Sequence, residues 1–194
     1  MKNKIIILLV YSLLLSTLSV AQKIKKPIEY AVTWEGAPGA LFLANSDYRF
    51  SQALSIEFSQ MTNENTRAGL RIHAGIGLNS FAGNYYSHGV EAFSRKHFYQ
   101  KDRWAIYGEW GLIGSVTWFE NENNLNNNPN VFINVGFKGG AGFEYKLGEK
   151  VSLDVKVNIA NLAYTRQVNN QGASNSYIHM TGPNRNPFSI GIRF

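Results

Sequence analysis

Apolar and polar residues alternate along most of the chain. The clearest run extends from Trp104 to Trp118, where every even-numbered position holds tryptophan, isoleucine, leucine, valine or glycine. The odd-numbered positions hold mostly polar or small residues, with Ile113 as the exception. Because successive side chains of a β-strand point to opposite faces, this period of two predicts a long strand with one apolar and one polar face.

The same alternation recurs in segments that turn-forming residues separate. It predicts further strands over residues 28–35, 67–79, 85–98, 131–147, 151–159 and 187–194. Residues 28–61 are expected to supply two spanning strands. A turn at residues 50–53 would divide the second part of this segment, and without that turn the second part is one long strand. The alternation slips near residues 161–164, which indicates a β-bulge.

The N-terminus has the pattern of a secretory signal peptide. A basic start at residues 1–4 precedes an apolar stretch over residues 5–15, and small residues Ser19 and Ala21 stand before Gln22. We therefore expect residues 1–21 to be removed and residues 22–194 to form the mature domain. A retained membrane anchor is the alternative, but the apolar stretch is short for a spanning helix.

Charge and cysteine content narrow the class of protein. The whole chain carries a formal net charge of +6 and contains no cysteine, so disulfides and a lipoprotein cleavage site are excluded. Removal of Lys2 and Lys4 with the signal peptide lowers the charge to +4. An exported basic chain seldom meets nucleic acid, and lipid phosphates are the expected anionic neighbours.

Long and short connections alternate between the predicted strands. The asparagine-rich residues 120–130 and the polar residues 167–186 are predicted as long loops, whereas residues 99–102 and 147–150 are predicted as short turns. Bacterial outer-membrane barrels have short periplasmic turns, long external loops and an even number of strands. The pattern predicts an all-β fold, a single closed antiparallel up-and-down transmembrane β-barrel, with eight strands or alternatively ten and both termini on the periplasmic side.

Alternation alone does not say whether the apolar row faces inward or outward. The fourteen steps from Trp104 to Trp118 span roughly 46 Å along a strand, or roughly 35 Å of membrane normal at a tilt of about 40°. Both tryptophans would then lie in aromatic girdles at the edges of the lipid band. Glycines in the polar row also leave room for long charged side chains inside a narrow lumen. They stand at positions 69, 75, 77, 111, 136, 140 and 142. We therefore predict an outward apolar row; a soluble periplasmic barrel of lipocalin type is the rival fold.

The charged polar row is then expected to fill the lumen. It comprises Glu57, Arg67, Arg71, His73, Glu91, Arg95, Arg103, Glu109, Lys138, Glu144, Lys146, Asp154, Lys156 and Arg193. An eight-stranded barrel has an interior just wide enough for side chains, and buried charges are costly unless they are paired. The expected members of a paired lumen polar network are Arg71, Arg95, Glu109, Lys138, Glu144, Asp154 and Arg193. The alternative is a polar conduit or proton path.

Four stretches of the chain carry a resemblance to a known family. They are Glu-Ala-Phe-Ser-Arg-Lys-His-Phe at residues 91–98, Trp-Ala-Ile-Tyr-Gly-Glu-Trp-Gly at 104–111, Gly-Ala-Gly-Phe-Glu-Tyr at 140–145 and the terminal Phe194. With them the chain resembles the small outer-membrane β-barrel proteins of Gram-negative bacteria, the OmpA/OmpX-like eight-stranded class. The resemblance implies a location in the outer membrane, contact with lipid and lipopolysaccharide, and a monomeric state. It also implies that the barrel-assembly machinery reads a C-terminal signal made of Phe188, Ile190, Ile192 and Phe194.

These observations predict a structural or surface-interaction role without catalysis, cofactor or metal. Transport of a small polar or hydrophobic solute is the alternative. A third reading is a lipid-modifying enzyme that combines His73 or His97 with Ser94 or Glu91, but no motif places such a nucleophile and base together. The four histidines, His73, His88, His97 and His179, have no ligand-like spacing, and no cysteine accompanies them.

Overall fold

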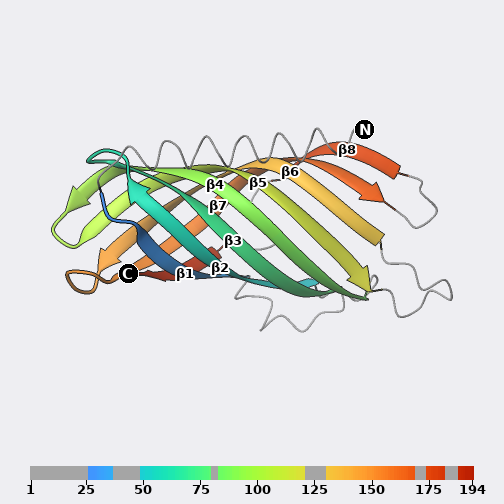
Figure 1. Ribbon diagram of the computed structural model, residues 1–194, viewed down its shortest axis with the longest axis horizontal. Helices are drawn as coiled ribbons and strands as arrows, with labels where there is room; N and C mark the ends of the chain where they lie inside the picture. Colours follow the sequence, from blue (N-terminus) through green and yellow to red (C-terminus); the bar gives the residue numbers. More distant parts are fainter. Residues whose placement is uncertain (1–25, 37–48, 80–82, 121–129, 169–173, 182–187) are drawn as a thin grey trace.

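The computed structural model describes residues 26–36, 49–79, 83–120, 130–168, 174–181 and 188–194 (Figure 1). The predicted signal peptide and most of the two predicted long loops lie outside these residues. Within the described residues, no helix is both long and apolar enough to cross a membrane.

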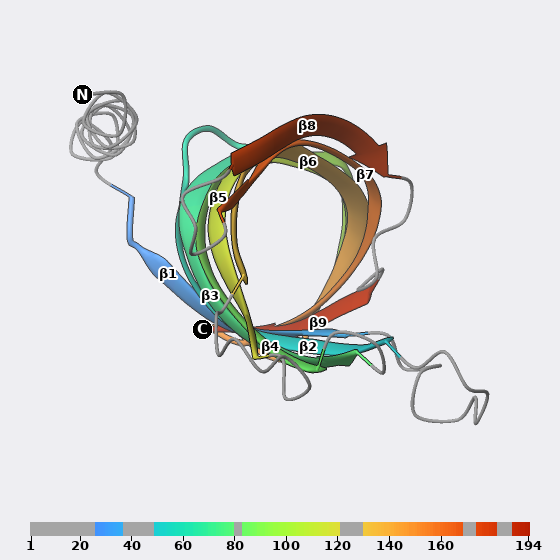
Figure 2. The same ribbon diagram turned by 90° about the vertical axis from the view of Figure 1, so that its right-hand side faces the viewer.

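The described residues form nine antiparallel strands. They are β1 (Glu29–Gly36), β2 (Arg49–Met61), β3 (Thr66–Asn79), β4 (Gly83–Lys101), β5 (Trp104–Glu120), β6 (Asn130–Lys146), β7 (Ser152–Val168), β8 (Ser174–Thr181) and β9 (Phe188–Arg193). Strands β1 to β7 pair in chain order, and β9 pairs with both β7 and β1. The sheet thus closes into a ring of eight strands, as predicted, and Figure 2 looks along its interior.

Strand β8 does not add a ninth position to the ring. One edge of β7 is paired with β6 along its length, so β8 and β9 share the other edge. On that edge β9 pairs with residues 152–157, and β8 pairs with residues 161–168. The two short strands therefore follow one another along a single strand position.

The structure decides between the two alternatives for residues 50–53 and corrects one predicted loop. Residues 50–53 lie inside β2, where Phe50 pairs with Leu78 and Ala53 with Gly75, so they form no turn. The predicted loop at residues 167–186 was partly wrong, because it contains β8. Tyr164 and Leu162 of β7 stand beside Ile178 and Met180 of β8, which gives this polar stretch an apolar outward row.

Short turns join the strands at one end of the barrel, which we call the turn end. Asp102 and Arg103 alone connect β4 to β5, and Asp102 has a left-handed φ of 51°. Aspartate tolerates this conformation better than most residues do. Residues 62–65 and 147–151 make the other two turns at this end, which also holds Glu29 and Phe194.

Two bulges adjust which side chains face outward. In β7, Ile159 is the extra residue, since Gly139 and Gly140 pair with Ala160 and Asn158. This bulge lies just before the predicted slip and keeps the apolar row of β7 outside on both sides of it. In β4, the register shifts between His97 and Tyr99, which leaves Phe98 exposed at the turn end.

The barrel is polar inside and apolar outside. Arg71 and Arg95 are each 1% exposed, whereas Ile72 is 54% and Leu112 is 49% exposed. Among the described residues, the buried apolar side chains are few, and Tyr85, Phe93 and Tyr107 are the large ones. This is the predicted orientation, and it is the reverse of a soluble barrel of lipocalin type, whose apolar side chains would line the interior.

Glycines of the inner row make room for large neighbours. The Tyr107 ring lies over Gly142 of the adjacent strand, and the Phe93 ring lies over Gly69. A Cβ atom at Gly142 would stand 2.5 Å from the Tyr107 hydroxyl oxygen and closer still to the Val155 carbonyl oxygen. Any side chain at this position would therefore displace the aromatic ring or the strand.

We expect Gly142→Ala to lower the free energy of unfolding by about 1–3 kcal/mol, because overpacking forces neighbouring groups off their positions. Gly114→Ala is the matched control, since a Cβ atom there meets nothing within 4 Å and should change stability by no more than about 0.5 kcal/mol. Urea unfolding followed by tryptophan fluorescence measures both. Equal stability of the two variants would contradict the proposed packing of Tyr107.

Candidate functional site: the ionic lumen

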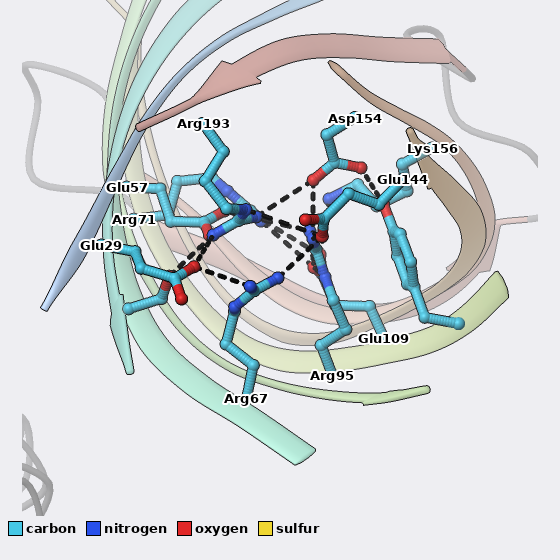
Figure 3. Close-up of polar contacts among 12 residues, drawn as sticks. Glu29, Glu57, Arg67, Arg71, Arg95, Glu109, Glu144, Asp154, Lys156 and Arg193 are labelled. Atoms are coloured by element: carbon cyan, nitrogen blue, oxygen red, sulfur yellow. Dashed lines mark hydrogen bonds and ion pairs between the residues drawn. The ribbon is translucent and has the colours of Figure 1, made fainter. Parts of the chain in front are cut away.

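In the half of the barrel near the turn end, the charged inward side chains form one ion-pair network (Figure 3). Strand register alone builds part of it. Glu57, Arg71 and Glu91 stand side by side on β2, β3 and β4, and Arg95 stands opposite Glu109 on β5. Opposite charges at directly paired positions attract one another, so these contacts follow from the alignment of neighbouring strands.

Arg71 and Arg95 occupy the centre of the network. The Arg71 guanidinium donates to Glu57 at 2.8 Å, to Glu91 at 2.9 Å and to Glu109 at 3.1 Å. The Arg95 guanidinium donates to Glu109 at 2.7 Å and 3.0 Å, with Nη2 and Nε bonded to the same oxygen. Glu109 is thereby shared between the two arginines.

Other contacts cross the lumen. Arg95 donates to Asp154 on β7 at 2.6 Å, and Arg67 donates to Glu144 on β6 at 2.8 Å. Register places Arg67 beside Arg95 and Glu144 beside Asp154, which are like-charge pairs. The closed ring brings the two pairs together, and these contacts across the lumen help to offset the repulsion within each pair.

Arg193 ties the last strand to the rest of the network. Its guanidinium donates to Glu57 at 2.6 Å, to the Ser59 hydroxyl at 2.8 Å and to Asp154 at 3.1 Å. These partners belong to β2 and β7. Arg193 therefore links side chains from both directions around the ring at the strand that closes the barrel.

Two lysines complete the network. The Lys156 ammonium donates to Glu109 at 2.6 Å, and the Lys138 ammonium donates to Glu35 at 3.2 Å. The Lys138–Glu35 pair lies farther from the turn end than the arginine cluster, because Lys138 stands at the middle of β6 and Glu35 near the far end of β1.

Charge in this part of the lumen is nearly balanced. The cations Arg67, Arg71, Arg95, Lys138, Lys156 and Arg193 face the carboxylates Glu29, Glu35, Glu57, Glu91, Glu109, Glu144 and Asp154. Each cation has a carboxylate oxygen within 3.2 Å. Removing one partner of a buried ion pair leaves an uncompensated charge, which is strongly destabilising.

Aromatic rings fill space between the charged groups. The Arg95 guanidinium carbon lies 3.9 Å from the centre of the Tyr107 ring, and that of Arg71 lies 4.6 Å from the centre of the Phe93 ring. The Tyr107 hydroxyl also donates to Asp154. Toward the turn end the lumen opens into a cavity of about 660 Å³, lined in part by Arg67, His97, Glu144 and Arg193. The network thus forms the wall of this cavity that faces the middle of the barrel.

All seven side chains predicted for the lumen polar network lie inside the barrel, and six of them contact another of the seven. Lys138 instead pairs with Glu35 and approaches Glu91. Glu29 and Glu35 were left out of the predicted lumen row, although both stand on the polar face of the strand predicted over residues 28–35. Arg103 and Lys146 were wrongly placed in the inner row: both are exposed, because the strands end beside them.

The enzyme constellation considered from the sequence is not assembled. His73, Glu91 and His97 lie on the inner row, whereas Ser94 lies on the outer row of β4. The sheet therefore separates the Ser94 hydroxyl from both imidazoles. In the described part of the chain, no three histidine or carboxylate side chains converge in a way that could hold a metal ion.

The side chains predicted for the girdles and the C-terminal signal lie outside the ring. The Trp104 ring is 4.4 Å from the Tyr145 ring at the turn end, and Trp118 lies 5.5 Å from the His88 ring at the other end. Phe188, Ile190 and Ile192 are each 41–44% exposed on β9. Phe194 follows them, and its backbone is hydrogen-bonded to Tyr30.

We expect Arg71→Met to lower the free energy of unfolding by about 3–5 kcal/mol, because the carboxylates of Glu57, Glu91 and Glu109 lose a shared cation. Arg103→Met is the matched control: it removes an exposed arginine and should cost no more than about 0.5 kcal/mol. Urea unfolding of both variants provides the measurement. An Arg71→Met protein as stable as Arg103→Met would mean that the network contributes little.

No model of a known protein family matches the chain, and no curated protein matches it. Among solved structures, the chain is similar to Neisserial surface protein A, with 14% sequence identity and a TM-score of 0.44. The match covers 86% of this chain and 93% of that one. Independently of this match, the strand pairing defines an all-β, closed, eight-stranded antiparallel barrel, which is the architecture of small outer-membrane barrels.

Proposed function

We propose that the protein is an integral outer-membrane β-barrel with a structural or surface-interaction role and a lumen closed by its own side chains. The observation that carries this proposal is the apolar outer wall. Among the described side chains, the outward positions of the ring carry no charge except Lys96 and Lys101 near the turn end and Arg166 near the other end. Isoleucine, leucine, valine and aromatic residues cover the wall between them.

Such a wall is poorly suited to water. Soluble monomers rarely expose contiguous apolar patches larger than a few hundred Å², whereas here the large apolar side chains of eight strands are exposed together. Hydrocarbon is the solvent that this surface matches. The ends of the wall also fit the interfacial regions, because Trp104 and Tyr145 lie at one end and Tyr86 and Trp118 at the other.

The signal peptide expected from the sequence gives the protein a route to the outer membrane. The turn end, which holds Glu29 and Phe194, then faces the periplasm, and lipopolysaccharide borders the other end of the wall. The barrel-assembly machinery reads Phe188, Ile190, Ile192 and Phe194, and the folded protein is a monomer. We propose no enzymatic role, since the inner row presents paired charges instead of a nucleophile and its base.

We expect Leu112→Arg to lower the free energy of unfolding from phospholipid vesicles by about 2–4 kcal/mol, the cost of a cation near the bilayer midplane. Leu112 lies on the outer wall near the middle of β5 and is 49% exposed. On a soluble protein the same exposed substitution should change stability by no more than about 0.5 kcal/mol. Urea titration measures the difference, with folded protein counted by the gel mobility of unboiled samples.

Gln100→Arg is the control for Leu112→Arg, because it adds the same charge at the exposed turn end and should cost about 0–1 kcal/mol. The unsubstituted protein should be found in the outer-membrane fraction, with a gel mobility that changes on boiling. Recovery in the soluble periplasmic fraction, together with a stable Leu112→Arg variant, would overturn the membrane assignment.

We also expect no stable single-channel current when the protein is inserted into planar bilayers. The transport alternative requires a continuous path, and the ion pairs around Arg71 and Arg95 occupy the lumen. Insertion is verified by the heat-dependent gel mobility of the same preparation, and a large porin in the same bilayer serves as the positive control. A reproducible current from the inserted protein would show that the lumen conducts.

A further inference from the structure

Exposed charge on the described side chains is concentrated at the turn end. The exposed cations there form what we call the basic rim: Lys26, Lys96, Lys101, Arg103, Lys146 and Lys150. Three exposed acids accompany them, Glu64, Asp102 and Glu149. Among the described side chains away from the turn end whose exposure is known, Arg166 is the one that is both charged and partly exposed. The turn end therefore carries a local excess of positive charge.

The rim cations differ from the lumen cations in their partners. Every lumen cation has a carboxylate within 3.2 Å. In contrast, no rim cation makes an ion pair within 4.0 Å to any residue that the structure describes. The lumen cations are thus paired with carboxylates inside the barrel, whereas the rim cations are available to bind an anion from outside.

Part of the rim lies at the aromatic edge of the apolar wall. Lys101 pairs across the β4–β5 turn with Trp104, and Arg103 precedes Trp104 in the chain. Lys146 follows Tyr145, whose ring contacts Trp104. When the wall is in hydrocarbon, its aromatic edge lies at the interface, so these ammonium and guanidinium groups reach the depth at which lipid headgroups lie.

We infer that the basic rim binds the phosphate-bearing headgroups of anionic phospholipids in the leaflet next to the turn end, and prefers them to zwitterionic ones. This inference rests on the proposed function, because it requires the wall to be in a bilayer. Lysine and arginine near a membrane surface gain free energy from anionic lipid, and the attraction falls off within a Debye length. The excess of cations over acids gives the attraction its sign.

Tryptophan fluorescence can test the inference with the full chain reconstituted in vesicles. A variant with Trp34→Phe, Trp110→Phe and Trp118→Phe keeps Trp104 alone beside the rim. A second variant keeps Trp118 alone at the opposite end. In mixed vesicles, either phosphatidylglycerol or phosphatidylcholine carries bromine on its acyl chains near the headgroup, and bromine quenches the nearby indole. Comparing the two mixtures gives the relative affinity of each site for the anionic lipid.

We expect Trp104 to report a preference of at least about threefold for phosphatidylglycerol, and Trp118 to report a smaller one. The preference at Trp104 should disappear when Lys101, Arg103, Lys146 and Lys150 are all replaced by glutamine. Boiled and unboiled gel samples show whether this variant folds. If it does not, the unsubstituted rim in 1 M salt replaces it, since a Debye length of about 3 Å screens the attraction.

The outcomes separate the two proposals. Equal quenching of Trp104 by both brominated lipids would overturn the lipid preference and leave the membrane assignment intact. A preference that persists after the four substitutions, or in high salt, would also overturn the role of the rim. Absence of quenching by either lipid would mean that Trp104 is not in a bilayer, and both proposals would then fail.

Discussion

The fold depends on the neutralisation of charge inside the barrel. Six cations and seven carboxylates lie in a narrow lumen, and an unpaired charge there would cost several kcal/mol. Neighbouring strands supply only some of the partners. Arg67 beside Arg95, and Glu144 beside Asp154, repel one another until the ring closes and matches the two pairs across the lumen. Closure and neutralisation therefore require each other.

The ionic interior decides what the exterior must be. With arginines and glutamates inside, alternation sends isoleucine, leucine and tryptophan outward, and little apolar surface remains to form a core. A large inward side chain fits where the neighbouring strand has glycine beside it, as Gly142 lies beside Tyr107. The apolar wall then needs a nonaqueous solvent, so the stability of the fold and the environment we propose for it are coupled.

Much of this arrangement could be predicted because alternation is a local property. The run from Trp104 to Trp118 determined both the strand and its faces, and glycines in the polar row indicated the inner side. The errors arose where strands begin and end. Arg103 and Lys146 have the parity of inner residues, yet the chain has already turned. Strand β8 was missed because its polar residues resemble a loop, and only its pairing with β7 shows otherwise.

The sequence by itself determined which side chains share a face, since that depends only on the period of two along an extended chain. It also determined the excess of positive charge and the turn-forming segments. Only the tertiary structure decided the partners: Glu57 meets Arg193, 136 positions away, and Arg67 meets Glu144. Such contacts depend on strand register and on ring closure around a common axis. Alternation carries no information about either, because every face looks alike until the strands are aligned.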